Sequence, residues 1–283
     1  MKITLSAYAK INLSLGIVGR RSDGYHLIQS VMQKISLADT VSLEPRSHGI
    51  TIQCNRASVP TNEKNLCYRA ADAYRKAAGI QNGVKIELHL SVPDMAGLGA
   101  GSADAAATLR AMKALYPSNV DLAQIANTIG ADVAFALNGK TALCEGIGEK
   151  LTELSFPAKG SLHAVIIKGE KGLSTPEVYS LFDRIEAKDT IVPQRENLIG
   201  ALGQKNPDML FSMMHNDLEL PAIALLPEIL EQKNLLLENG ADAAMMTGSG
   251  SAVFGLFTDE KKARSASEEL KKHLPFSEYC TLI

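Results

Sequence analysis

The stretch "SVPDMAGLGAGSADAAATLRAMKALYP", residues 91–117, places Gly97, Gly99 and Gly101 at alternate positions and then runs into an alanine-rich segment with helical periodicity. Residues 84–92 before it alternate between apolar and polar side chains, as a strand does. Glycines let an anion approach backbone N–H groups, and a helix N-terminus attracts negative charge. Such a loop between a strand and a helix predicts a phosphate-binding site. Close packing of the helix against a sheet is the structural alternative.

Two familiar phosphate-binding loops do not match this stretch. A Walker A loop needs a lysine directly after its glycines, and none follows Gly101. A dinucleotide-binding fingerprint counted from Gly97 needs a glycine where Ser102 stands, and it begins directly after its strand. The loop therefore belongs to neither class.

Composition narrows the class of protein further. The 283 residues are 46% hydrophobic and 21% charged, with 29 basic against 31 acidic side chains. This balance predicts a folded protein with a sizeable core and gives no reason to expect nucleic acid as a partner. The four cysteines are scattered without metal-binding spacing, and no leader or run of about 18 apolar residues occurs. We expect a cytoplasmic protein with reduced thiols that does not interact with membranes.

Hydrophobic periodicity predicts mixed helices and strands. Residues 3–17 alternate strictly, which predicts a strand with Lys10 and Asn12 together on its polar face. The remaining predicted strands cover residues 29–36, 41–45, 50–55, 141–154, "LHAVIIK", the two sides of the glycine turn in 243–257, and "EYCTLI". The remaining predicted helices cover residues 65–78, 121–129, 176–184 (N-cap Thr175), 207–215, 226–239 and 259–273. Together they predict an α+β fold with two domains, 1–157 and 158–283, joined near "FPAKGS".

Several polar positions allow two interpretations when each is taken alone. Lys10 is either an exposed strand residue or a functional cation. Asp132 within "ADVAFAL" either caps the helix that follows or faces a cavity, because a lone buried carboxylate is costly. The "TGSGS" segment, 247–251, is either an ordinary tight turn or a second glycine surface over a ligand.

Taken together, "AYAKINL", the quoted loop and "MTGSGSAVFGLF" resemble the three signatures of the GHMP family of small-molecule kinases, in the same order. The resemblance spans almost the whole chain. It implies a two-domain GHMP-kinase fold, with an N-terminal ATP-binding domain, a ferredoxin-like C-terminal domain and an active site in the cleft between them. It also implies ATP and Mg²⁺ as cofactors.

The resemblance assigns roles to individual residues. Asp132 matches the catalytic aspartate that accepts the proton of the substrate hydroxyl, and Lys10 matches its partner lysine. Ser102 is also a candidate ligand of magnesium. The positions matching the ATP site are Asn65, Pro93, Asp94, Met95, Ala96, Gly97, Leu98, Gly99, Ala100, Gly101, Ser102 and Ala103.

Within the family, "RRSDGYH", "STPEVY" and "HNDLE" are most similar to members that phosphorylate a cytidine-diphosphate-linked sugar alcohol in the non-mevalonate synthesis of isoprenoid precursors. The positions that match the substrate pocket are Asn12, Tyr25, His26 and Tyr179. Two alternatives stay open: a GHMP kinase for another small alcohol, mevalonate or homoserine, and a nucleotide-binding regulatory paralogue without turnover. We expect a monomer or a homodimer.

The sequence departs from the common family pattern at several positions. Ala103 stands where many members carry a serine, and Gly169–Glu170 stands where prolines are usual. If the missing hydroxyl normally donates to the transferred phosphoryl group, its loss costs about 3 kcal/mol. If it only packs, the cost is below about 1 kcal/mol.

Overall fold

The computed structural model describes residues 1–155, 162–185, 200 and 207–283. Contacts divide the chain into two compact units. The first unit contains Met1–Ala9, Leu37–Val92 and Gly99–Gly139, and the second contains Lys10–Ser36, Pro93–Leu98 and Lys140–Ile283. Strands β1 (Ile3–Arg20) and β2 (His26–Arg46) each contribute residues to both units. The expected domain boundary at "FPAKGS" lies outside the described residues.

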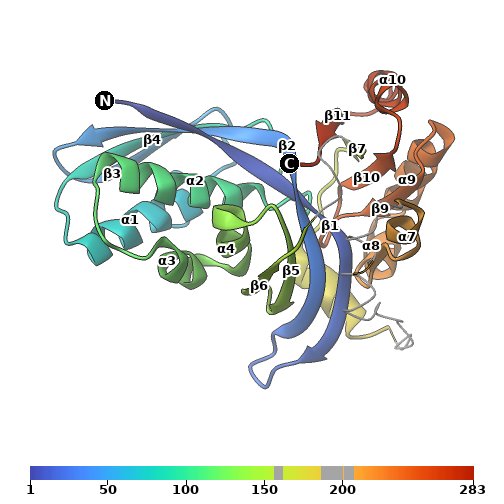
Figure 1. The fold of residues 1–283 in the computed structure, drawn as a ribbon, viewed down its shortest axis with the longest axis horizontal. Coiled ribbons are helices and arrows are strands. Elements are labelled where there is room, and N and C mark those ends of the chain that lie inside the picture. The colour runs from blue at the N-terminus through green and yellow to red at the C-terminus, as the bar shows by residue number, and fades with distance from the viewer. Residues whose placement is uncertain (156–161, 186–199, 201–206) are drawn as a thin grey trace. The chain divides into compact units, whose positions relative to one another are not determined.

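The first unit is a sheet with helices on one face (Figure 1). The C-terminal half of β2 pairs antiparallel with β4 (Gly83–His89), which pairs parallel with β3 (Ile50–Cys54). The helices are α1 (Leu66–Ala78), α2 (Ala100–Leu115), α3 (Leu122–Ile129) and α4 (Ala131–Asn138). Their buried faces form one apolar core with the sheet, including Tyr74, Ile86, Leu109 and Met112.

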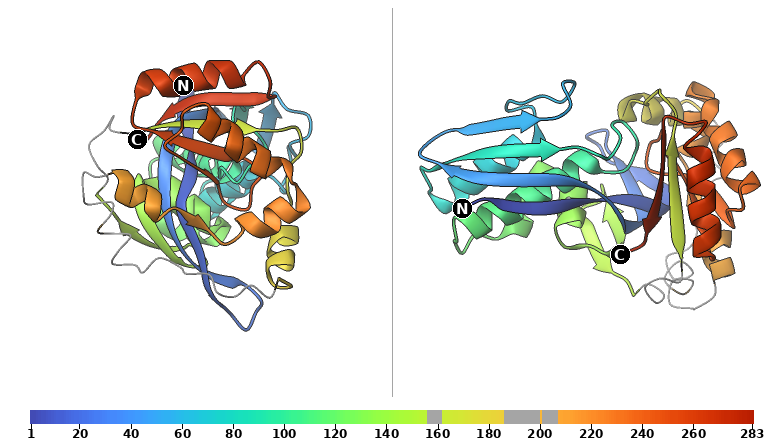
Figure 2. Two further views of the ribbon diagram at one scale, coloured as in Figure 1. Left: turned by 90° about the vertical axis from the view of Figure 1, so that its right-hand side faces the viewer. Right: turned by 90° about the horizontal axis from the view of Figure 1, so that it is seen from above.

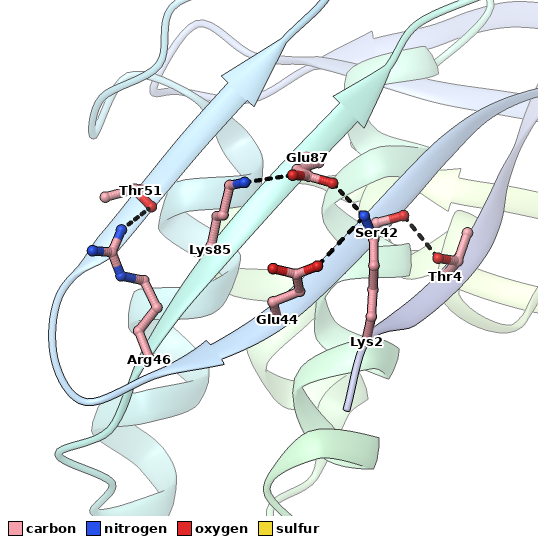
Figure 3. Close-up of polar contacts among 8 residues, drawn as sticks. All are labelled: Lys2, Thr4, Ser42, Glu44, Arg46, Thr51, Lys85 and Glu87. Atoms are coloured by element: carbon pink, nitrogen blue, oxygen red, sulfur yellow. Dashed lines mark hydrogen bonds and ion pairs between the residues drawn. The ribbon is translucent and has the colours of Figure 1, made fainter.

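The opposite face of this sheet is polar. Its side chains come from the start of the chain and from β2, β3 and β4 (Figure 3). Lys2 bonds to Glu87, and Thr4 and Ser42 hydroxyls lie 2.8 Å apart. Polar side chains on this face pair with one another, whereas the opposite face of the sheet packs against the helices.

The second unit contains a four-stranded antiparallel sheet of order β11-β7-β10-β9. Its strands are β7 (His163–Lys168), β9 (Ala243–Met246), β10 (Val253–Phe257) and β11 (Phe276–Thr281). In chain order these are strands 4-1-3-2, which is the ferredoxin-like arrangement that the resemblance implied. Helices α9 (Glu228–Glu238) and α10 (Glu260–Leu270) cover one face of this sheet (Figure 2).

The second unit also contains strands that pair with β1 and β2, and three short helices. Strand β5 (Thr141–Gly146) pairs with the first half of β2 and with β6 (Lys150–Glu153). The short β8 (His215–Asn216) pairs parallel with β1 at Ser14 and Leu15. Three further helices are α5 (Thr175–Phe182), α7 (Pro207–Ser212) and α8 (Glu219–Leu225). In the described parts of the chain, no helix has the length and apolar character needed to cross a membrane.

The structure differs from the predicted elements at a few places. The predicted strands 29–36 and 41–45 are one continuous β2. Asp39 between them is buried, and its carboxylate accepts hydrogen bonds from the N–H groups of Ser91 (2.5 Å) and Val92 (2.7 Å). A polar residue therefore continues the strand here. Helix α8 was not predicted, and α4 was anticipated only as the helix that Asp132 would cap.

Thr175 was predicted as a helix N-cap, and this is wrong. Helix α5 includes Thr175, and Ser174 is the N-cap. The Thr175 hydroxyl lies 2.7 Å from the Ser249 hydroxyl instead. The Thr175 hydroxyl therefore pairs with a residue distant in the chain, although the local sequence predicted that it would cap the helix.

Candidate active site

A buried polar cluster forms on β1 in the second unit. The Lys10 ammonium donates to the Asn12 side-chain oxygen at 2.7 Å and to the Gly97 carbonyl at 2.8 Å. The two side chains therefore lie together, as the strand alternation predicted. Lys10 is 6% exposed and Asn12 is fully buried, so the exposed-strand interpretation of Lys10 is wrong.

The Asn12 amide is held in one orientation. Its Nδ2 donates to the Ser30 hydroxyl at 2.8 Å, while its Oδ1 accepts from Lys10 and, at 3.3 Å, from the Thr247 hydroxyl. Thr247 also accepts the backbone N–H of Asn12 at 3.0 Å. Sequence reasoning did not single out Thr247, although it lies in the "TGSGS" segment whose role was left open.

The two glycine-rich stretches meet inside the second unit. A Cβ atom at Gly97 would lie 2.1 Å from the Thr247 carbonyl oxygen, and one at Gly248 would lie 2.9 Å from the Gly97 oxygen. The backbone N–H groups of Ser251 and Ala252 donate to the carbonyls of Met95 and Ala96, each at 3.2 Å. Gly97 is thus required by close approach of two backbones, a cause that the sequence did not reveal.

Asn216 also holds this glycine turn. Its Nδ2 donates to the carbonyls of Met246 and Gly248, both at 2.9 Å, and its Oδ1 accepts the N–H of Leu218. Because β8 pairs with β1, this side chain connects the β1 strand to the turn that contains Thr247. The motif "HNDLE" was noted in the sequence, but its structural role was not predicted.

The glycine loop continues into α2 in the first unit. Gly99 is the N-cap, with φ of 68°, and it gives no side-chain hydrogen bond to the helix. No acidic side chain lies in the first turn, so the N–H groups there meet no carboxylate from their own turn. Ala103 is 3% exposed and belongs to the first-unit core, which favours the packing interpretation of this departure from the family pattern.

Asp132 lies in the first turn of α4, in the first unit. Gly130 is the N-cap of this helix, so the interpretation of Asp132 as a capping residue is wrong. Its side chain is half-buried. Lys10 lies in the second unit, and its pairing with Asp132 stays a prediction.

Asn65 has a clear structural role in the first unit. It caps α1 by accepting the N–H of Cys67 at 2.8 Å, and its Nδ2 donates to the Pro60 carbonyl at 2.7 Å. Both ends of its amide are therefore engaged. A contact between Asn65 and nucleotide stays a prediction.

A pocket of about 460 Å³ lies in the second unit beside His26. The His26 ring lies 4.8 Å from the Tyr179 ring, and its Nε2 is 2.7 Å from the Asp183 carboxylate. Arg20 also pairs with Asp183, at 3.3 Å. Tyr25 is 63% exposed. The residues lining the pocket are Ile17, Val18, Gly19, Arg20, His26, Phe182, Asp183, Ile185, Asp217, Leu220 and Pro221.

The arrangement can thus present a fixed cation, a fixed amide and an imidazole within one unit. Phe182 and Asp183 were not predicted, although they lie three and four residues after the "STPEVY" motif. In the described ranges of the chain, no group of three or more histidine, cysteine, aspartate or glutamate side chains could hold a metal ion by itself.

Comparison with known protein families agrees with this fold and these motifs. The sequence model of the GHMP kinases N terminal domain matches residues 65–140, and that of the GHMP kinases C terminal domain matches residues 198–275. The chain belongs to the GHMP kinase family, a class of ATP-dependent kinases.

Individual relatives give a more specific comparison than the family models do. The chain is 43% identical to 4-diphosphocytidyl-2-C-methyl-D-erythritol kinase of Acetivibrio thermocellus, over 95% of each chain. It also resembles a crystal structure of 4-(cytidine 5'-diphospho)-2C-methyl-D-erythritol kinase, with 39% identity, a TM-score of 0.84 and 99% of each chain covered. Homoserine kinase from Cytophaga hutchinsonii is 22% identical with a TM-score of 0.79, covering 100% of this chain and 94% of that one, and so shares the fold.

Proposed function

We propose that this enzyme transfers the γ-phosphate of ATP to a hydroxyl of 4-diphosphocytidyl-2-C-methyl-D-erythritol, a step in the non-mevalonate synthesis of isoprenoid precursors. The observation that carries the choice of substrate is 43% identity over 95% of both chains with a relative of that name. The lower identity to homoserine kinase supports only the fold. The earlier alternatives, mevalonate and homoserine, are therefore disfavoured.

The His26 pocket supports a substrate with a nucleobase. We assign the cytosine ring to the surface formed by His26 and Tyr179, with Asp183 fixing the orientation of the imidazole through the 2.7 Å contact. Stacking of a base on an aromatic side chain contributes about 1 to 3 kcal/mol by analogy with single-strand binding. Tyr25, which is exposed, would cover the base from the solvent side. An aliphatic alcohol could not obtain this stacking contribution from the His26 and Tyr179 rings.

The acceptor hydroxyl needs a base and a fixed position. We propose that the Asp132 carboxylate accepts its proton as the oxygen attacks the γ-phosphorus. Asn12, whose amide is held by Ser30 and Thr247, would orient the substrate. The Lys10 ammonium, fixed by Asn12 and the Gly97 carbonyl, would offset negative charge on the transferred group.

The start of α2 is suited to the triphosphate. A Cβ atom at Gly101 would make only an ordinary 3.8 Å contact with Leu66, so the chain itself does not require glycine there. Close approach of a phosphate to backbone N–H groups gives a reason. Mg²⁺ fits this site because it binds through substrate phosphates and few protein ligands, and it would neutralise charge on the phosphates. We assign Ser102 as the side chain that would hold it.

The test is ATP consumption by the purified protein with magnesium, offered the cytidyl substrate, mevalonate and homoserine in parallel. We expect ADP release with the cytidyl substrate alone, and loss of that release in Asp132→Asn with an unchanged unfolding temperature. Turnover of mevalonate or homoserine instead would contradict the substrate assignment. ATP binding without any turnover would favour the regulatory paralogue.

Three coarser features complete the proposal. We propose domains at 1–157 and 158–283, a cytoplasmic location, and a monomer or homodimer. All four cysteines lie in the described residues and none is in a disulfide, which is compatible with a reducing compartment.

A further inference from the structure

A buried lysine at the end of β7 holds a turn of the second unit. Lys168 is 6% exposed, and its Nζ donates to the carbonyls of Gly169 (3.1 Å), Glu170 (3.5 Å) and Lys171 (3.1 Å). An ammonium has three donors, and three successive carbonyls accept them here. The charge therefore fixes the path of a turn that contains glycine and no proline.

This turn lies directly against the Pro93–Leu98 segment of the glycine loop. The Lys171 carbonyl that accepts from Lys168 also accepts the Ser251 hydroxyl at 2.7 Å, and the Ser251 N–H donates to the Met95 carbonyl at 3.2 Å. A Cβ atom added at Gly172 would lie 2.6 Å from the Met95 Cβ. The 169–172 turn, Ser251 and Met95 are therefore in direct contact.

Met95 needs such support. Its φ is +49°, and non-glycine side chains disfavour this left-handed conformation, which persists where surrounding contacts hold it. Its side chain is 58% exposed, so its backbone contacts, and not burial of the side chain, hold it. These contacts are the hydrogen bond from the Ser251 N–H to the Met95 carbonyl and the close approach of the 169–172 turn.

We propose that Lys168 is a positioning residue for the nucleotide, acting through the 169–172 turn and Ser251 on the Asp94–Met95 part of the glycine loop. This rests on the proposed ATP site at Pro93–Ala103. Lys168 does not itself contact ATP in this proposal, because its ammonium is engaged with the three carbonyls. The sequence departure at Gly169–Glu170 falls in this turn, where the charge restricts a backbone that proline does not.

Electrostatics supports a pH-dependent role. Burial lowers the pKa of the Lys168 ammonium, while the carboxylates of Asp94 on the loop and Glu228 on α9 act in the opposite direction. Raising the pH through a lowered pKa removes one proton and hence one of the donors to the turn. ATP binding by the wild type should therefore weaken at high pH.

The experiment measures binding of ATP alone by calorimetry, without acceptor, so its outcome is independent of which alcohol is phosphorylated. Lys168→Met removes the charge and keeps the length of the side chain. Lys168→Met removes all three donors to the turn, but their loss reaches ATP only indirectly through the loop. We therefore expect the Kd for ATP to rise about tenfold, which is no more than one charged hydrogen bond contributes. The matched control is Lys171→Met in the same turn, whose side chain is 71% exposed and pairs with Glu228 at 3.6 Å. Its Kd should stay within about twofold.

Two further measurements separate positioning from general stability. Ser251→Ala breaks the hydroxyl link to the Lys171 carbonyl, and its effect on Kd should be less than additive with Lys168→Met, because both act through one path. The weakening of ATP binding at high pH should also be smaller in Lys168→Met than in the wild type. Equal Kd for Lys168→Met and wild type, additive effects, or an unchanged pH profile would each overturn the proposal.

Discussion

Two lysines near the N-terminus, Lys2 and Lys10, stand at positions that strand alternation assigns to one face, but their environments differ. The Lys2 side chain is 43% exposed and pairs with Glu87 and, at 3.6 Å, with Glu44 (Figure 3). Lys10 is 6% exposed and donates to the amide oxygen of Asn12 and the carbonyl of Gly97. Lys2 lies among carboxylates at the surface, whereas Lys10 is buried and hydrogen-bonded to an amide oxygen and a backbone oxygen.

The difference separates a solvated surface ion pair from a desolvated cation. Exposed ion pairs contribute about 0 to 1 kcal/mol, because water and salt screen them. A buried cation loses hydration and is tolerated only where it is well hydrogen-bonded. Burial of Lys10 beside the glycine loop is therefore not expected to add net stability, and the proposed role in phosphoryl transfer gives it a purpose.

The largest effect expected from this comparison is on catalysis. Lys10→Met should lower kcat by about a hundredfold or more, equivalent to about 3 kcal/mol, because a fixed cation near the transferred group is lost. Lys2→Met, the matched exposed variant, should leave kcat within about twofold. ADP release and thermal unfolding of both variants check this. Retention of kcat in Lys10→Met, or activity lost only in step with unfolding, would show that its burial has no catalytic purpose.

A smaller effect is expected when a buried amide is compared with an exposed hydroxyl. Asn216→Leu leaves the carbonyls of Met246 and Gly248 without their donor, which should lower the free energy of unfolding by about 2 kcal/mol or more. Thr4→Ala, which removes the 2.8 Å contact between the exposed Thr4 and the Ser42 hydroxyl, should change it by about 1 kcal/mol or less, because only one neutral, part-buried hydrogen bond is lost. Urea denaturation measures both. Similar losses in the two variants would contradict the contrast.

The smallest expected effect is on stability at low pH. Hydrogen bonds from Lys2 and then Lys85 lower the pKa of Glu87 from 4.5 to about 2. Because the folded-state pKa is depressed, the stabilisation is present above pH 4.5 and is lost as the pH falls towards 2. Lys2→Met should raise the pKa of Glu87 and narrow this window, as carbon NMR of its carboxyl group measures. High salt should reduce the difference between variant and wild type. An unchanged pKa would show that Lys2 is not its main partner.

Sequence alternation predicted which side of β1 carries Lys10 and Asn12, but not that this side is buried. Alternation depends on the period of a strand, which is local. Burial depends on which other segments pack against the strand. The Lys10 ammonium donates to the carbonyl of Gly97, which is 87 residues away in the chain. The same reasoning explains Thr175, where a partner at Ser249 competes with the local capping geometry.

Motifs were more informative than single residues. "TGSGS" and "HNDLE" were visible in the sequence, but the roles of Thr247 and Asn216 were not, because their partners lie in distant segments. Gly97 and Gly101 looked equivalent in the sequence. Cβ contacts separate them, since only Gly97 would collide with the chain itself.

The sequence by itself determined the local elements, the order of the three glycine and lysine signatures and, through them, the kinase family and the α+β class. Tertiary structure alone decided which polar groups are buried, which glycine is needed for backbone contact, and which side chains hold the glycine turn and the 169–172 turn. The physical reason is that helix and strand periodicity is set by near neighbours, whereas desolvation and hydrogen-bond satisfaction depend on atoms brought together from far apart in the chain.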